Sequence, residues 1–106
     1  MKIKIIHPST NNIALAQTIA NTLVNNNLSP CVQIIPKIIS IYKWNNKLES
    51  TDEYLIVIKT FLNNIKKCQD LIQKLHNYDT PEIIVYESEI FINKYKRWFN
   101  QNLDSN

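Results

Sequence analysis

Glycine is absent from this sequence of 106 residues. Turns that need a positive φ angle must therefore use other residues, and asparagine adopts that conformation more readily than most. Asparagine occurs as a run at residues 25–27 and as a pair at Asn45 and Asn46. We predict that the run ends a helix in place of a C-terminal glycine, and that the pair forms the two-residue type I′ turn of a β-hairpin.

Cysteines, long apolar runs and clustered positive charges are also scarce. The two cysteines, Cys31 and Cys68, are far apart, and the apolar N-terminus reaches Pro8 too soon for a signal peptide. We therefore expect reduced thiols and a cytoplasmic protein. No apolar stretch approaches the ~20 residues that cross a bilayer. The net charge of +3 is spread along the chain, so we expect neither a membrane nor a nucleic acid as a partner.

Hydrophobic residues make up 44% of the chain and charged residues 20%, which is typical of a globular protein. The length suits one domain over residues 1–106. Helical periodicity covers residues 13–24 and 65–75, the second segment capped by Asn63 or Asn64, and strand-like segments cover residues 3–6, 31–44, 47–60 and 82–86. His7 and Pro8 should end the first strand, and Asn93 should cap a short C-terminal helix. This order predicts an α+β, ferredoxin-like β-α-β-β-α-β sandwich with a long central hairpin.

The central hairpin is long for so small a domain. Each arm of about 13 residues would span roughly 43 Å, whereas a compact domain of this length has a diameter near ~33 Å. Pro36 cannot donate to a ladder and should mark a bulge. Apolar residues occupy both faces of the second arm: Tyr54, Ile56 and Ile58 on one face, Leu55 and Val57 on the other. Because helices cover one face of such a sheet, we expect a neighbouring subunit to cover the second.

Several activities known for this fold lack their residues here. The loop after the first strand contains no C-x-x-C pair for a metal chaperone and no arginine for a phosphate cradle, since the only arginine is Arg97. The central strands carry isoleucine where an RNA-binding domain has stacking aromatics. P-loop, G-x-S-x-G and H-E-x-x-H motifs are missing. These absences favour binding over catalysis.

A few residues are candidates for a site, each with a structural alternative. His76, Tyr78, Asp79 and Glu82 share one turn, which is typical either of a metal or small-ligand site or of a helix end organised by its polar residues. Lys59 is either a cation that faces Glu82 or a solvated strand end. Cys31 is either a soft ligand or a small core residue, and Cys68, on an apolar helix face, is predicted to be core. Trp44, at the hairpin tip, either packs on a neighbour or stacks on a ligand.

Four segments together resemble the CutA family of divalent-ion tolerance proteins. They are residues 31–36 (CVQIIP), residues 40–49 with Tyr42 and Trp44, residues 58–60 (IKT) and residues 76–84 (HNYDTPEII). The flanks fit as well, at residues 15–24, Leu28 and residues 95–98. The resemblance runs in order along nearly the whole chain.

The resemblance implies a homotrimer with interlocked hairpins, a role in tolerance of copper and other divalent ions, and no enzymatic activity. Two glycines usual in the family are replaced by Lys37 and Asn46. Of the three copper ligands assigned in some members, one position falls at about Ile5 and the adjacent histidine pair is Leu75 and His76. His76 is therefore the one metal-ligand candidate, and weak copper binding is expected.

The leading hypothesis is a homotrimeric divalent-metal response protein that acts by binding. We predict a cleft at the subunit boundary built by Lys59, Tyr78 and Glu82, with Trp44 as a possible wall. One alternative is a trimeric small-molecule-binding signalling or scaffold module with no metal. A second is an enzyme that uses Lys59, Tyr78 and Glu82, although nothing in the sequence supplies an activated nucleophile.

Overall fold

Strands and helices follow the predicted order in the computed structural model, which describes residues 1–103. The elements are β1 (Lys2–Thr10), α1 (Ile13–Asn25), β2 (Cys31–Trp44), β3 (Lys47–Thr60), the 3-10 turn η1 (Leu62–Asn64), α2 (Ile65–Leu75), β4 (Ile83–Glu89) and α3 (Asn93–Gln101). The strands form an antiparallel sheet in the order β2-β3-β1-β4. The prediction of a ferredoxin-like fold is confirmed.

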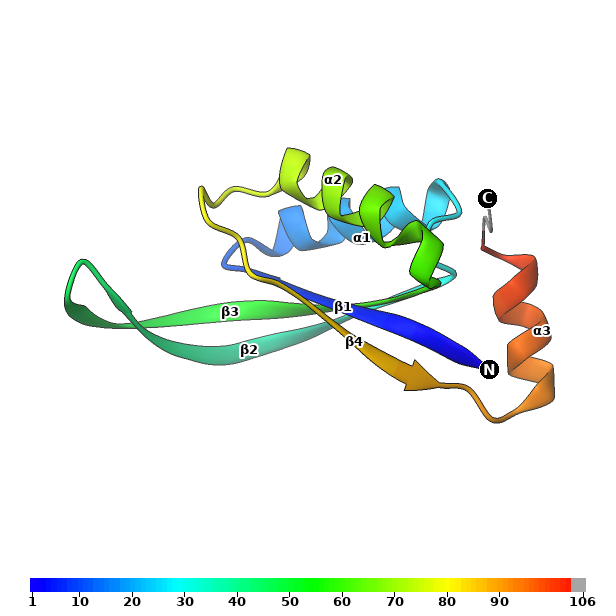
Figure 1. The fold of residues 1–106 in the computed structure, drawn as a ribbon. Coiled ribbons are helices and arrows are strands. Elements are labelled where there is room, and N and C mark those ends of the chain that lie inside the picture. The colour runs from blue at the N-terminus through cyan, green and yellow to red at the C-terminus, as the bar shows by residue number, and fades with distance from the viewer. Residues whose placement is uncertain (104–106) are drawn as a thin grey trace.

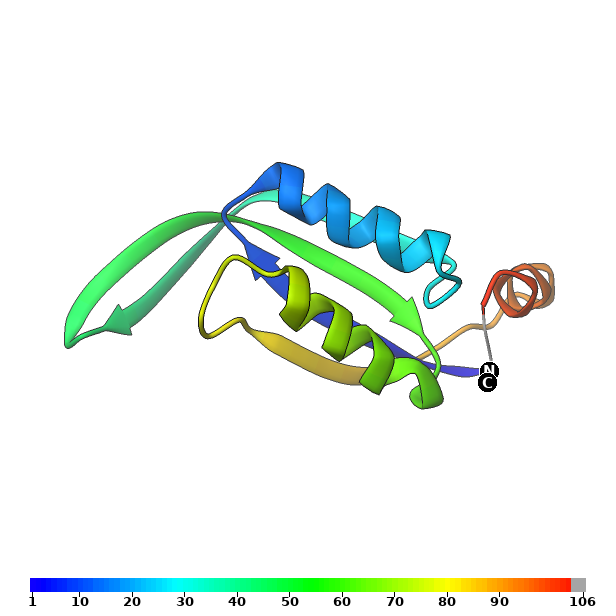
Figure 2. The same cartoon turned by 90° about the horizontal axis from the view of Figure 1, so that it is seen from above.

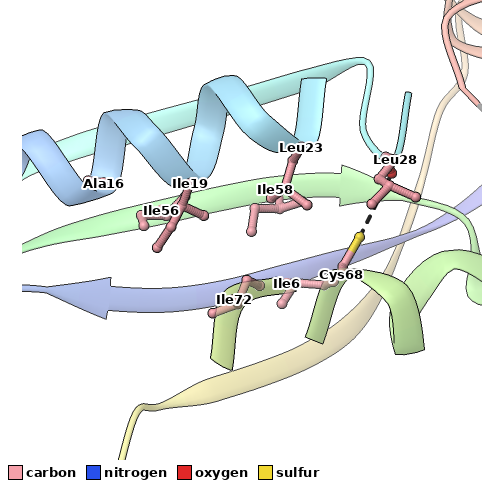
Figure 3. Packing of buried hydrophobic residues seen from close by; sticks show 9 residues of the cluster. All are labelled: Ile6, Ala16, Ile19, Leu23, Leu28, Ile56, Ile58, Cys68 and Ile72. Carbon is pink, nitrogen blue, oxygen red and sulfur yellow. Dashed lines mark hydrogen bonds between the residues drawn. The ribbon is translucent and has the colours of Figure 1, made fainter. Parts of the chain in front are cut away.

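Helices α1 and α2 run side by side over one face of the sheet (Figures 1 and 2). The main hydrophobic core lies between these two helices and the central strands (Figure 3). Its fully buried members include Ile6 of β1, Ile56 and Ile58 of β3, Ile19 of α1 and Ile72 of α2. Burying one such side chain contributes roughly 1.5–3 kcal/mol. The alternation along β3 therefore sends its isoleucines inward, as the sequence predicted.

Cys68 belongs to the same core. Its side chain is fully buried, and its Sγ donates a hydrogen bond to the Leu28 carbonyl oxygen at 3.9 Å (Figure 3). Burial raises the pKa of the Cys68 thiol to about 11, only partly opposed by a hydrogen bond with Thr60. The thiol therefore stays protonated at neutral pH and acts as a small apolar residue.

Helix α1 begins and ends on asparagines. The Asn12 side-chain oxygen accepts a hydrogen bond from the Leu15 N–H at 3.0 Å, which caps the first turn. At the other end Asn27 has a φ angle of 56°, and the Leu28 N–H donates to the Leu23 carbonyl at 3.0 Å. This is the Schellman arrangement that usually uses glycine. The prediction that asparagine ends this helix is confirmed.

The β2–β3 hairpin extends past both helices, and the molecule measures 47 × 25 × 21 Å (Figure 1). At the tip Asn45 and Asn46 have φ angles of 53° and 63°. Two successive positive φ angles define a type I′ turn, whose twist matches that of the flanking strands. Both the overhang and the asparagine turn are therefore confirmed.

A bulge interrupts the hairpin where the sequence predicted one. The register of β2 against β3 shifts between Ile35 and Ile38, on either side of Pro36 and Lys37. Lys37 has a φ angle of 59°, which is uncommon for a lysine and is the conformation that glycine adopts most easily. The bulge therefore explains why a glycine suits the residue after this proline.

Three expectations from the sequence need correction. Strand β1 does not end at His7 and Pro8 but continues to Thr10, because the fixed φ of proline suits an extended strand. Helix α3 begins at Asn93, so Ile92 and not Asn93 occupies the cap position. The second face of the sheet is also partly covered within the chain, because α3 lies at the end opposite the hairpin tip and buries Phe99 in a second apolar cluster with β1 (Figure 1).

We expect replacement of Asn46 by valine to lower the free energy of unfolding by about 1 kcal/mol or more, because a β-branched residue resists a positive φ angle. Asn46→Gly is the matched control and should be neutral or stabilising. Chemical denaturation of the three proteins measures the effect. Equal unfolding midpoints for the valine variant and the original chain would show that the turn does not require this conformation.

Candidate functional site

A hollow of about 910 Å³ lies between the outer part of the hairpin and the turn that precedes β4. Small-molecule sites commonly have volumes of roughly 300–1,000 Å³. The lining combines aromatic, hydroxyl and carboxylate side chains: Ser9, Ser40, Ile41, Tyr42, Trp44, Glu49, Glu53, Tyr78, Asp79, Thr80 and Glu82. The hollow is therefore large enough for a small organic molecule.

Three of the four predicted cleft residues meet at this hollow. Trp44 comes from the end of β2, while Tyr78 and Glu82 come from the segment between α2 and β4. Glu82 is held next to β1, because the Ser9 hydroxyl donates a hydrogen bond to its Oε2 at 3.3 Å. The sequence thus identified the two elements that face each other across the hollow.

Lys59 does not line the hollow. Its Nζ lies 4.0 Å from the Cys31 sulfur and 5.9 Å from the centre of the Tyr95 ring. The cause is the register of the sheet: Ser9, beside Glu82, pairs with Leu55, which precedes Lys59 by four residues or roughly 13 Å along the strand. Lys59 and Glu82 therefore do not pair within one chain, and a cleft that contains both stays a prediction about assembled subunits.

Glu53 is the residue that sequence reasoning missed. Only 6% of its surface is exposed, and its Oε2 accepts a hydrogen bond from the Tyr78 hydroxyl at 2.8 Å. Residues 49–53 contain three acids and look like a solvated segment. The available signal was strand alternation, which places Glu53 on the same face as Leu55 and Val57.

The Glu53 carboxylate also governs the chemistry of Tyr78. Burial, first, and then the hydrogen bond to Glu53 and its negative charge raise the pKa of Tyr78 to about 12. The phenol is therefore a hydrogen-bond donor at neutral pH and does not supply a phenolate nucleophile or base. This pair can orient a ligand or accept a cation, but it does not activate a reacting group.

The turn that carries Tyr78 is fastened to the end of β1 by two side chains. The His76 Nδ1 accepts a hydrogen bond from the Tyr78 N–H at 3.0 Å, so the ring proton lies on Nε2, which donates to the Ser9 carbonyl at 2.7 Å. The Asn77 amide accepts from Thr10 at 2.7 Å and donates to Asn11 at 2.9 Å. These contacts fix the position of Tyr78 over the hollow.

Copper does not fit at His76 in this arrangement. Both ring nitrogens are engaged in hydrogen bonds, so neither offers a lone pair to a metal without breaking one of them. Within residues 1–103, no group of three or more histidine, cysteine and acidic side chains lies close enough together to hold a metal ion. Asp79 and Glu82 line the hollow, whereas His76 serves the turn. The second interpretation of this turn, an organised helix end, agrees better with the geometry.

The remaining candidates lie outside the hollow. Cys31 is partly buried at the start of β2 beside Lys59, and it is not bonded to Cys68. The His7 Nε2 lies 3.0 Å from the Tyr86 hydroxyl on the open face of the sheet. No helix within residues 1–103 has the length and apolar character that a membrane span requires.

The fold, the overhanging hairpin and the hollow at its base define a ferredoxin-like protein equipped for binding and assembly. Residues 4–102 match the sequence model of the CutA1 divalent ion tolerance protein family. The chain belongs to this family, and the resemblance seen in the sequence is confirmed.

Individual relatives agree with this assignment. The divalent-cation tolerance protein CutA of Thermus thermophilus is 33% identical over 88 residues, which cover 83% of this chain and 85% of that protein. Protein CutA of Homo sapiens is 34% identical over 94 residues, which cover 89% of this chain. The matched region spans about half of the human and Arabidopsis thaliana relatives, at 52% and 54% of their lengths.

Solved structures give the same answer for the fold. The crystal structure of CutA1 from Oryza sativa superposes with a TM-score of 0.92 at 26% identity, covering 99% of this chain and 95% of that one. The structure of the divalent cation tolerance protein from Thermus thermophilus gives a TM-score of 0.89 at 29% identity, covering 98% and 100%. The long hairpin is therefore a feature of the shared fold.

We expect Tyr78 to be the last of the five tyrosines to ionise, with a pKa of about 12. Because the folded state raises this pKa, the associated stability is fully present below the unfolded value of about 10 and is lost as pH rises towards 12. Ultraviolet titration of tyrosinate measures it. Glu53→Gln should lower the value only in part, since burial is the largest cause, and Glu89→Gln should not change it. A fifth tyrosine that titrates near 10 would contradict the assignment.

Proposed function

We propose that this chain is a single-domain, homotrimeric divalent-cation tolerance protein that acts by binding and not by catalysis. Membership of the CutA1 family over residues 4–102 is the observation that carries the proposal. The tolerance role comes from the names of relatives such as the Thermus thermophilus protein. The hollow supports binding over catalysis, because its phenol stays protonated and hydrogen-bonded to Glu53.

Exposed apolar side chains support the trimer. Ile39, Ile41 and Leu48 on the hairpin arms are 67–76% exposed, and Trp44 at the tip is 56% exposed. Large apolar residues gathered on one projecting element usually mark an interface. The outer edge of β2 is also unpaired within residues 1–103, and an open strand edge invites pairing with another chain. A trimer with interlocked hairpins would cover both features.

We propose that copper, if it is the physiological ion, binds weakly to an isolated chain. The engaged ring of His76 supports this proposal. The runner-up function, a trimeric small-molecule-binding module without a metal, is favoured by one specific observation, the hollow of about 910 Å³ with its mixed aromatic and polar lining. We place the protein in the cytoplasm, since both cysteines are unpaired.

We expect light scattering at micromolar concentration to give three times the 12.5 kDa mass of one chain. Ile39→Lys should shift the protein towards smaller species, because it puts a charge into the proposed interface. Ile13→Lys is the matched control: this residue is also exposed, at 41%, but lies on α1 away from the hairpin. A stable, folded monomer of the original chain would refute the trimer.

Copper(II) titration by calorimetry is expected to show weak binding that His76→Gln leaves unchanged. Glutamine can still hydrogen-bond the Ser9 carbonyl but offers no imidazole to a metal. Far-ultraviolet circular dichroism checks that the variant remains folded. Tight copper binding that the His76→Gln substitution abolishes would show that the ring leaves its hydrogen bonds and serves as a ligand.

A further inference from the structure

The hollow carries negative charge that nothing in it balances. Four of its lining residues are acidic, namely Glu49, Glu53, Asp79 and Glu82, and neither lysine nor arginine lines it. The ion pairs seen within residues 1–103 join Lys2 and Lys4 to Glu87 and Lys66 to Asp70, all outside the hollow. The lining therefore favours a positively charged occupant.

Glu53 makes this more than a group of surface acids. Its side chain is more than nine-tenths buried, yet its carboxylate has one hydrogen bond, from the neutral Tyr78 hydroxyl. Its other oxygen, Oε1, has no hydrogen-bond partner within residues 1–103. A buried carboxylate without a cation is costly, and a bound cation would offset that cost. The missing partner of Glu53 is accordingly a cationic group that enters from the hollow.

The same geometry argues against a bare metal ion. The acids are not gathered closely enough to form a group of three ligands within residues 1–103, and a hollow of about 910 Å³ is far larger than one ion needs. Trp44 and Tyr42, 56% and 42% exposed, also belong to the lining. Aromatic faces beside carboxylates are the surroundings that bind ammonium groups through cation–π contacts.

We propose that the hollow binds a small organic cation carrying an ammonium group, with that group at the Glu53 carboxylate and its carbon chain along Trp44 and Tyr42. A molecule with two ammonium groups suits the site best, since the second group would reach the acids at the rim, Glu49 and Glu82. This inference goes beyond metal tolerance and does not rest on it.

The test is calorimetry on the full chain in its native assembly, at fixed ionic strength, with 1,4-diaminobutane as the probe. The uncharged analogue 1,4-butanediol, magnesium and manganese serve as comparison ligands. We expect the diamine to bind and the diol not to bind. Glu53→Gln should weaken diamine binding tenfold or more, because glutamine keeps the hydrogen bond from Tyr78 and removes the charge. Trp44→Leu should weaken it roughly threefold to tenfold.

Glu89→Gln removes one exposed acid outside the hollow and is the matched control, expected to leave the affinity unchanged. Equal losses for Glu53→Gln and Glu89→Gln would mean general attraction to an acidic surface and would overturn the proposal. Failure of the diamine to bind would overturn it as well. Tighter binding of manganese than of the diamine, sensitive to Glu53→Gln, would assign the hollow to a metal instead. Copper tolerance is not a readout of any arm, so its failure leaves this result standing.

Discussion

The antiparallel pairing of β2 with β3 is the interaction on which the other features depend. The ladder runs from Cys31 opposite Lys59 to Trp44 opposite Lys47, with one bulge on the way. Its inner half supplies Ile56 and Ile58 to the core, and its outer half has no helix above it (Figure 1). A hairpin anchored in a core at one end and free at the other can carry apolar residues outward to a partner. The same strands that stabilise the chain therefore prepare it for assembly.

The bulge at Pro36 and Lys37 divides these two roles. It adds one residue to β2 between Ile35 and Ile38 and increases the local twist. Beyond it the hairpin turns its Trp44 and Tyr42 towards the segment that precedes β4, and the hollow lies between them. A chain without glycine reaches this geometry by placing a lysine in the left-handed region. The strain of that residue is supported by the paired strands on either side of it.

The polar contacts at the base of the hollow connect distant parts of the sequence. The His76 ring and the Asn77 amide tie the turn to the end of β1, and Tyr78 then reaches Glu53 on β3. Hydrogen-bond networks of this kind hold a site rigid when every member has a partner. The histidine that the family resemblance suggested as a metal ligand has become part of this support. Membership of a metal-tolerance family and the absence of a copper site at His76 are compatible, because the fold outlasts changes in its sites.

The sequence by itself determined the features that depend on neighbours along the chain. Asparagine at positions 27, 45 and 46 predicted the left-handed turns, and alternation in β3 predicted which isoleucines point inward. Such features follow from backbone sterics and side-chain period, which act locally. The order of elements was enough to give the fold.

Only the tertiary structure decided the site. Glu53 and Tyr78 are 25 residues apart, and His76 and the Ser9 carbonyl are 67 apart. Whether an acid is buried, or a histidine ring is already engaged, depends on the register that brings such residues together. Lys59 shows this most clearly: its residue type suits a cation beside Glu82, but four residues of strand place it near Tyr95 instead. Chemistry between distant residues is set by packing, and no local pattern encodes it.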